Sequence, residues 1–198
     1  PGSRPSESIT QKDKGASIWM MREMVKLITD GPRLVQSQSS HGGRRFLLLI
    51  DDTECGAGLS FVKTLLMPKQ TQQSSFVECS VTDFPDDCQD HIHQDAIIAM
   101  ARGMQQGKTV LVTHLVPVSP AFFTLLNLEY ESNKNKEGDV HFANIAIGPI
   151  LRPYSVNEKF SIVVHMTRSE METAPTALMN RFQKILFTFD DLVDYLKD

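Results

Sequence analysis

Two adjacent carboxylates, Asp51 and Asp52, follow the apolar run Leu47–Ile50, and Glu54 comes two residues after Asp52. Oxygen ligands of this kind suit Mg²⁺, and an acidic group at the end of a strand could also accept a phosphoryl group. The same residues suit a simpler role, in which the strand ends in polar residues and Asp52 or Thr53 caps the next helix. We favour the capping role and keep the acidic pocket as the alternative.

A phosphate-binding loop needs the pattern Gly-x4-Gly-Lys-Ser/Thr, because its backbone amides surround the phosphates and its lysine neutralises their charge. The closest triplet in this sequence is Gly107-Lys108-Thr109. Its upstream glycine, Gly103, has the wrong spacing, and the triplet precedes a strand instead of opening a helix. We therefore predict that the chain has no phosphate-binding loop.

The elements that would position these residues alternate between strands and helices. Strands are predicted at 45–50, 75–81, 109–113, 160–166 and 185–189, and helices at 17–30, 59–66, 88–106, 121–130 and from 190 onward. Such alternation predicts a three-layer α/β fold, in which a mainly parallel sheet carries helices on both faces. Residues 141–147 and 150–154, joined by Gly148-Pro149, predict an inserted β-hairpin. The charged residues 131–138 before it are predicted to form a loop.

Several of these segments resemble, in their order, one AAA module of the mysterin family of giant AAA+/RING-finger ubiquitin ligases. They are Gln106–Leu115, Leu125–Asn127, the hairpin Val140–Tyr154, the strand and polar tip Phe160–Thr167, and the helix that runs from Pro175 through Ala177–Phe182. The similarity covers roughly residues 46–189 in the order of elements. It implies an AAA+ core that lacks its phosphate-binding loop.

The resemblance also implies roles for four residues. Thr167 stands at the sensor-1 position, and Arg181 stands where an arginine finger would reach a neighbouring module's nucleotide. His114 and Leu115 occupy the place of the acid pair that binds magnesium and activates water, and neither side chain can do that work. No catalytic residue is therefore expected in this segment. The simpler role for Arg181 is a surface ion pair with Glu170 or Glu172.

Cofactors and partners follow from the resemblance alone. ATP and Mg²⁺ are expected in other modules of the parent protein, and no cofactor is expected in this segment. The expected partners are neighbouring AAA+ modules of the same chain, and, through the parent, a ubiquitin-conjugating enzyme and ubiquitin. The expected location is the cytoplasm, with the family's link to lipid droplets. Whether this segment is itself an enzyme is left open, although it reads as inactive.

Composition excludes some classes of function. The 198 residues carry a net charge of −4 without a long run of Lys or Arg, so no nucleic-acid partner is expected. Every apolar run is shorter than the roughly 20 residues that a membrane helix needs. Cys88, His91 and His93 are closely spaced, but no second cluster completes a zinc site, and we predict no metal.

The sequence thus divides into a flexible leader at 1–16, a degenerate AAA+ module at 17–189, and the start of a helical lid or linker at 190–198. The predicted function is that of a non-hydrolysing module of a ubiquitin ligase, acting in architecture and in relaying nucleotide state. One alternative is a free-standing Mg²⁺-binding or phospho-acceptor domain that uses Asp51 and Asp52. Another is an α/β interaction domain with no relation to nucleotides.

Overall fold

The computed structural model describes residues 45–53, 55–67, 76–82, 90–135 and 138–197, together with Arg22 and Lys26. The predicted leader, most of the predicted helix 17–30, and Glu54 lie outside the described residues. In chain order the elements are β1 (Phe46–Asp51), α2 (Ala57–Leu66), β2 (Phe76–Ser80), α3 (Asp90–Gln105), β3 (Thr109–Thr113), the 3₁₀ helix η1 (Val116–Phe122), α4 (Phe123–Leu126), β4 (Glu131–Asn135), β5 (Gly138–Ile147), β6 (Ile150–Val156), β7 (Ser161–Thr167), α5 (Arg168–Thr173), α6 (Thr176–Met179), β8 (Phe182–Phe187) and α7 (Phe189–Lys197).

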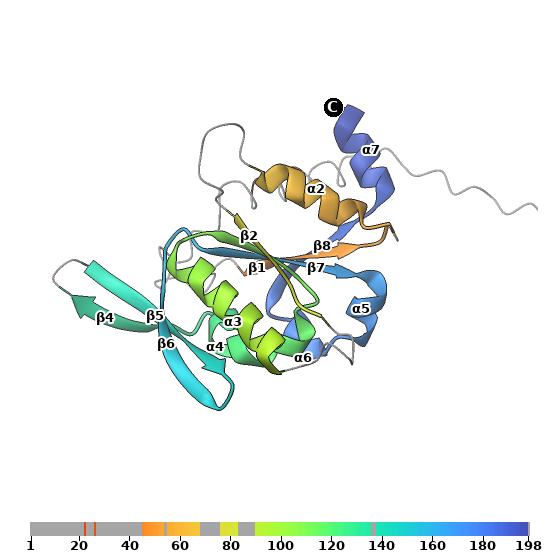
Figure 1. The fold of residues 1–198 in the computed structure, drawn as a ribbon. Coiled ribbons are helices and arrows are strands. Elements are labelled where there is room, and N and C mark those ends of the chain that lie inside the picture. The colour runs from red at the N-terminus through yellow and green to blue at the C-terminus, as the bar shows by residue number, and fades with distance from the viewer. Residues whose placement is uncertain are drawn as a thin grey trace, which may run out of the picture.

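A five-stranded parallel sheet forms the centre of the molecule, with the strand order β2-β3-β7-β1-β8 (Figure 1). β1 therefore lies between β7 and β8, the two strands of this sheet that come last in the sequence. The predicted α/β fold with a mainly parallel sheet is confirmed.

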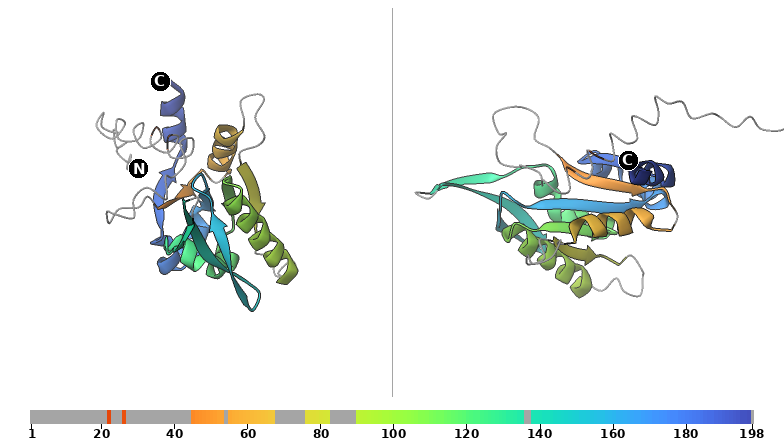
Figure 2. Two further views of the ribbon diagram at one scale, coloured as in Figure 1. Left: turned by 90° about the vertical axis from the view of Figure 1, so that its left-hand side faces the viewer. Right: turned by 90° about the horizontal axis from the view of Figure 1, so that it is seen from above.

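Helices cover both faces of this sheet, which explains why its central strands are apolar throughout. All six residues of β1 are buried. Phe46, Leu48 and Ile50 face a cluster that includes α3, η1 and α4, while Leu47 and Leu49 face a smaller cluster beneath α2. Figure 2 shows α2 and α7 on one side of the sheet and α3 on the other.

The predicted hairpin is present as β5 and β6, which pair antiparallel from His141 with Val156 to Ile147 with Ile150. The structure corrects the prediction for the charged segment before it. Residues 131–135 form β4, which pairs antiparallel with β5, so the insertion is a three-stranded sheet. In Figure 1 this second sheet projects from one end of the main body.

Two further predictions about local structure are wrong. Residues 121–130 were predicted as one helix, but η1 and the four-residue α4 occupy part of this region. Pro120 lies inside η1 and cannot donate an amide hydrogen bond, which favours the short 3₁₀ geometry here. Residues 168–173, for which the sequence predicted neither a helix nor a strand, form α5. Its start is stabilised by a reciprocal capping box between Thr167 and Glu170.

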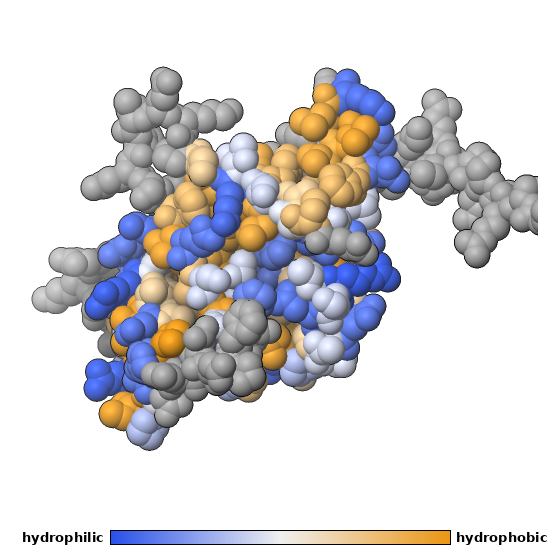
Figure 3. Space-filling model, turned by 45° about the vertical axis from the view of Figure 1, so that its right-hand side comes forward, coloured by the Kyte–Doolittle hydropathy of each residue, from blue (hydrophilic) through white to orange (hydrophobic). Residues whose placement is uncertain are grey.

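The final helix, α7, has one face on the core and one face toward solvent. Leu192 packs against the cluster beneath α2. Phe189, Val193 and Leu196 continue the same apolar stripe of the helix beyond Leu192, and they are 50%, 44% and 71% exposed. Figure 3 shows the resulting apolar surface at the top of the view.

The first prediction concerns the double-sided burial of β1. Leu48 is fully buried, so Leu48→Ala removes contacts on a packed face and should lower the free energy of unfolding by about 2–5 kcal/mol. Leu151→Ala, at a position 62% exposed on the hairpin, is the matched control and should change it by less than about 0.5 kcal/mol. Urea denaturation measures both values. Equal losses in the two variants would contradict the assignment of β1 to the core.

Candidate functional site

Polar residues collect at one edge of the main sheet, where the carboxyl ends of its parallel strands meet. Asp51 ends β1 and is in register with Thr167, which ends β7. Thr113 ends β3, and its hydroxyl donates a hydrogen bond to Ser80 Oγ at the end of β2. In open α/β sheets, ligands bind at this edge, beside the strand where the order reverses. Here that strand is β1, since the later strands β7 and β8 lie on either side of it.

The Asp51 carboxylate is the most heavily bonded group at this edge, and only 3% of the residue is exposed. Its Oδ1 atom accepts hydrogen bonds from the amide and the hydroxyl of Thr53, at 3.0 and 2.6 Å. Its Oδ2 atom accepts from the amides of Gly58 and Leu59, at 2.9 and 3.4 Å. His165 Nε2 on β7 donates to the same oxygen at 3.0 Å.

These bonds cap α2 from outside the helix. Gly56, which precedes the helix, has a left-handed φ of 73° and has no side chain with which to accept amide protons. Asp51 accepts from two first-turn amides in its place, and Thr53 Oγ1 accepts from the amide of Ala57 at 3.0 Å. The capping role predicted for this segment is thus present, although Asp51 carries most of it and Asp52 does not. The negative charge of Asp51 also suits the positive end of the helix dipole.

Gly58 allows this close approach. A Cβ atom on Gly58 would lie 2.8 Å from Asp51 Oδ2 and 3.1 Å from a ring carbon of Phe187. Any larger residue would therefore push the carboxylate away from the helix. The fit between Asp51 and the start of α2 depends on the absence of a side chain at this position.

Hydrogen bonding outweighs burial in setting the pKa of Asp51. Burial alone would raise the pKa of this carboxyl group. The hydrogen bonds from the Thr53 hydroxyl, from His165 and from the Thr53 amide all favour the ionised form, and the net effect is a pKa below the ordinary value of 3.8. Asp51 is therefore an anion at neutral pH.

The segment from Asp51 to Gly58 joins β1 to α2, which is the place in the fold where a phosphate-binding loop would lie. Its spacing also matches: Asp51 and Gly56 stand at the two glycine positions of Gly-x4-Gly-Lys-Ser/Thr, and Ala57 and Gly58 stand at the lysine and hydroxyl positions. This alignment was not predicted from the sequence, although the five-residue separation of Asp51 and Gly56 is a signal for it. Ala57 and Gly58 therefore supply neither the ammonium group nor the magnesium-binding hydroxyl of a phosphate-binding loop.

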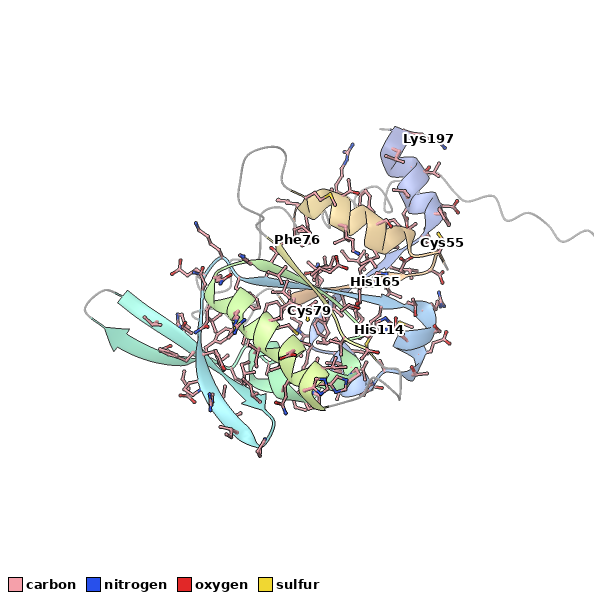
Figure 4. The ribbon with its side chains drawn as sticks, viewed as in Figure 1. Cys55, Phe76, Cys79, His114, His165 and Lys197 are labelled. Atoms are coloured by element: carbon pink, nitrogen blue, oxygen red, sulfur yellow. The ribbon has the colours of Figure 1, made fainter. Side chains whose placement is uncertain are left out.

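A second polar group links β3 to α5 through Glu170. Glu170 Oε2 accepts hydrogen bonds from the amide and hydroxyl of Thr167, at 2.7 and 2.9 Å. Its other carboxylate oxygen lies against His114 Nδ1. Figure 4 labels His114 beside α5 and His165 on β7. From the sequence, Glu170 was predicted only as an alternative partner for Arg181, and its contact with His114 was not predicted.

The residues predicted at the acid-pair position have separate surroundings. His114 follows β3 with a left-handed φ of 55° and contacts Glu170. Leu115 is fully buried in the larger apolar cluster. Thr167, predicted at the sensor-1 position, lies in register with Asp51, and its hydroxyl is used in the capping box.

Asp52 and Arg168 form an exposed ion pair with an N–O distance of 3.3 Å, which ties the end of β1 to α5. Arg168 also lies 3.7 Å from Glu172, one turn along the helix. Of the predicted acidic pocket, Asp51 is buried under its donors and Asp52 is paired. Within the described residues, no group of three or more His, Cys, Asp or Glu side chains is placed to hold a metal ion. Glu54 lies outside them.

Arg181 lies at the opposite edge of the sheet, directly before β8 begins. Its Nε atom donates to Asn127 Oδ1 at 2.5 Å, and its Nη1 atom donates to the carbonyl oxygen of Ala177 at 3.0 Å. Its guanidinium group also lies 4.5 Å from the ring centre of Phe123. The ion pair with Glu170 or Glu172 considered from the sequence is not formed, since these residues contact His114, Thr167 and Arg168.

Two comparisons with known proteins bear on this site. The family model described as "RNF213 AAA domain" matches residues 36–193. A putative uncharacterized transmembrane protein of Dictyostelium discoideum is 21% identical over 153 residues, which is 77% of this chain. The chain spans about 2% of the length of that relative. In the part of this chain that the structure describes, no helix is long and apolar enough to span a membrane.

The central position of the Asp51 carboxylate gives a prediction about stability. Asp51→Asn replaces an accepting oxygen by a donor that faces the amides of α2, and it should lower the free energy of unfolding by about 3–5 kcal/mol. The control is Asp52→Asn, which removes one partner of an exposed ion pair and should cost less than about 1 kcal/mol. Urea denaturation at neutral pH measures both. Similar losses of unfolding free energy in the two variants would show that the buried hydrogen bonds of Asp51 add little to stability.

The lowered pKa of Asp51 also predicts how stability depends on pH. The ionised carboxylate stabilises the fold above its ordinary pKa of 3.8, and this contribution is lost as the pH falls through the lower pKa of the folded state. On acidification below that ordinary value, the parent should therefore lose more unfolding free energy than Asp51→Asn. Denaturation at a series of pH values tests this. If the difference in unfolding free energy between the two proteins stayed constant over this pH range, the prediction would be refuted.

Proposed function

The chain belongs to the mysterin family, because it matches the RNF213 AAA domain of that family, and we propose that it acts as a non-hydrolysing module within a longer ubiquitin ligase. Its role is to support the arrangement of neighbouring AAA modules and to relay their nucleotide state to the ligase part of the parent protein. The family match confirms the resemblance found in the sequence. The inactive role and the relay are our proposals.

The observation that carries the proposal is the use of the α2 amides by Asp51. In a nucleotide-binding module, amides at this helix start bind phosphate, and a lysine and a hydroxyl complete the site. Here two of these amides already donate to a buried carboxylate. An incoming phosphate would meet the charge of Asp51 and would find Ala57 and Gly58 at the lysine and hydroxyl positions.

The end of β3 supports the same conclusion. A hydrolysing module needs an acidic residue here to orient a metal ion or activate water. His114 and Leu115 supply neither, and Glu170 is held by Thr167 and His114. A module of this kind can respond to its neighbours only through its surfaces. We therefore propose other AAA modules as its direct partners, and ubiquitin and its conjugating enzyme as partners of the parent, in the cytoplasm.

We keep the role of Arg181 as an arginine finger as a proposal. Asn127, Ala177 and Phe123 hold its side chain within its own chain. Reaching a neighbouring nucleotide would require at least part of this set of contacts to open. The present geometry supports a role in joining α4 to α6.

Calorimetric titration of the chain with ATP and ADP, with and without Mg²⁺, tests the proposal. We expect no saturable binding and no ATP turnover, because Asp51 occupies the phosphate-binding amides. Mg²⁺ alone, titrated into the parent and into Asp51→Asn, tests the alternative of an acidic metal site. Saturable Mg²⁺ binding that Asp51→Asn abolishes would favour that alternative, and tight nucleotide binding would contradict the proposal.

A rebuilt loop provides the complementary test. The triple variant Asp51→Gly, Ala57→Lys and Gly58→Thr restores the full phosphate-loop pattern and removes the internal carboxylate. It should gain saturable ATP binding, whereas Ala57→Lys alone, which keeps Asp51, should not. Circular dichroism establishes that each variant is folded. A folded triple variant that binds no nucleotide would show that this loop is not equivalent to a phosphate-binding loop.

A further inference from the structure

A cleft of about 470 Å³ lies between α3 and the turn of the β5–β6 hairpin. α3 leads into the amino end of β3, so the last turn of α3 lies at the edge of the sheet opposite the polar strand ends. Ile98, Ile147 and Tyr154 give the cleft an apolar surface, and Arg102 and Arg152 give it positive charge. None of these residues has a part in the site described above.

Among the residues that the structure describes, neither arginine has a counter-ion. Both are exposed, and neither forms an ion pair or a hydrogen bond with any side chain or backbone group that the structure describes. The arginines of the main body behave differently: Arg45, Arg168 and Arg181 each contact an acceptor. Two unneutralised guanidinium groups beside one cleft repel each other, and a bound carboxylate would relieve that repulsion.

The dipole of α3 explains the position of only one of the two arginines at the cleft. Arg102 lies in the last turn of α3, where a positive charge is favourable. Arg152 lies on β6, which has no comparable dipole. Its presence at the cleft therefore needs a different explanation.

The hairpin turn is held near α3 and exposes apolar side chains. Gly148 has a left-handed φ of 58°, and a Cβ atom at this position would lie 3.5 Å from Gln94 Nε2 on α3. Ile150, which also lines the cleft, is 49% exposed. The cleft thus combines positive charge with an apolar wall and an apolar rim.

We propose that this cleft binds a short acidic segment of a protein partner, with its carboxylates on Arg102 and Arg152 and its large apolar side chains against Ile98, Ile147 and Tyr154. Guanidinium groups bind carboxylates through paired hydrogen bonds, and an apolar anchor adds the buried area that charge alone does not provide. The exposed Ile150 favours a protein partner, whereas a nucleic-acid surface would be expected to carry a longer basic stripe. This inference does not depend on the proposed absence of nucleotide binding.

The test uses the whole 198-residue chain and a fluorescein-labelled peptide in which Asp and Glu surround a central Leu-Phe pair. Fluorescence anisotropy should show saturable binding that weakens as salt is added. Arg102→Gln and Arg152→Gln should each weaken binding about fivefold or more, and the double variant about 20-fold or more. Replacing Leu-Phe in the peptide by Gly-Ser should also weaken binding.

Lys184→Gln is the matched control, because it removes one exposed positive charge on β8, away from the hairpin. It should leave binding unchanged, and all variants should unfold at the parent's temperature. Absence of saturable binding, or equal weakening by Lys184→Gln, would overturn the proposal. Tighter binding of a single-stranded oligonucleotide, with the same dependence on both arginines, would overturn it in favour of nucleic acid.

Discussion

The hydrogen bonds of the Asp51 carboxylate hold together two neighbouring segments of the chain and a third that lies 114 residues further along. They join the end of β1 to the start of α2 and to His165 on β7. Because β1 is the strand beside which ligands bind in this kind of sheet, one buried anion fixes the geometry of the whole edge. The rest of the site follows from this: Gly58 must lack a side chain, Gly56 leaves the capping to others, and Thr53 supports the same carboxylate.

Acidic side chains satisfy helix starts at two places along this edge. Asp51 accepts from the amides of α2, and Glu170 accepts from the amide and hydroxyl of Thr167 at the start of α5. In each case a group that could otherwise meet a ligand is bonded within the chain. At the other edge, Arg181 is bonded in the same manner to α4 and α6. These three side chains are held by bonds within the chain, and such fixed ends of the sheet suit the architectural role proposed above.

The parts of the fold that could be predicted are those with a strong local pattern. The apolar runs of β1 and β3 and the Gly148-Pro149 turn identified their elements directly. β4 was missed because its sequence, Glu-Ser-Asn-Lys-Asn, has no apolar alternation, and its pairing with β5 depends on backbone hydrogen bonds. α5 was missed because it is short and polar, although the Thr167-x-x-Glu170 spacing is that of a capping box. Arg181 was identified by position, but its contacts with Asn127 and Phe123 depend on tertiary packing that no local pattern specifies.

The central place of β1 has a consequence for the order in which the protein can fold. The bond between Asp51 and His165 spans 114 residues, and both strands that flank β1 come from the last part of the described chain. On the ribosome, the apolar face of β1 therefore emerges long before either of its partners has been made. Contacts so distant in sequence slow folding and leave the strand exposed to aggregation in the meantime. The Asp51 carboxylate can therefore gain its His165 partner only late in synthesis, after β7 has left the ribosome.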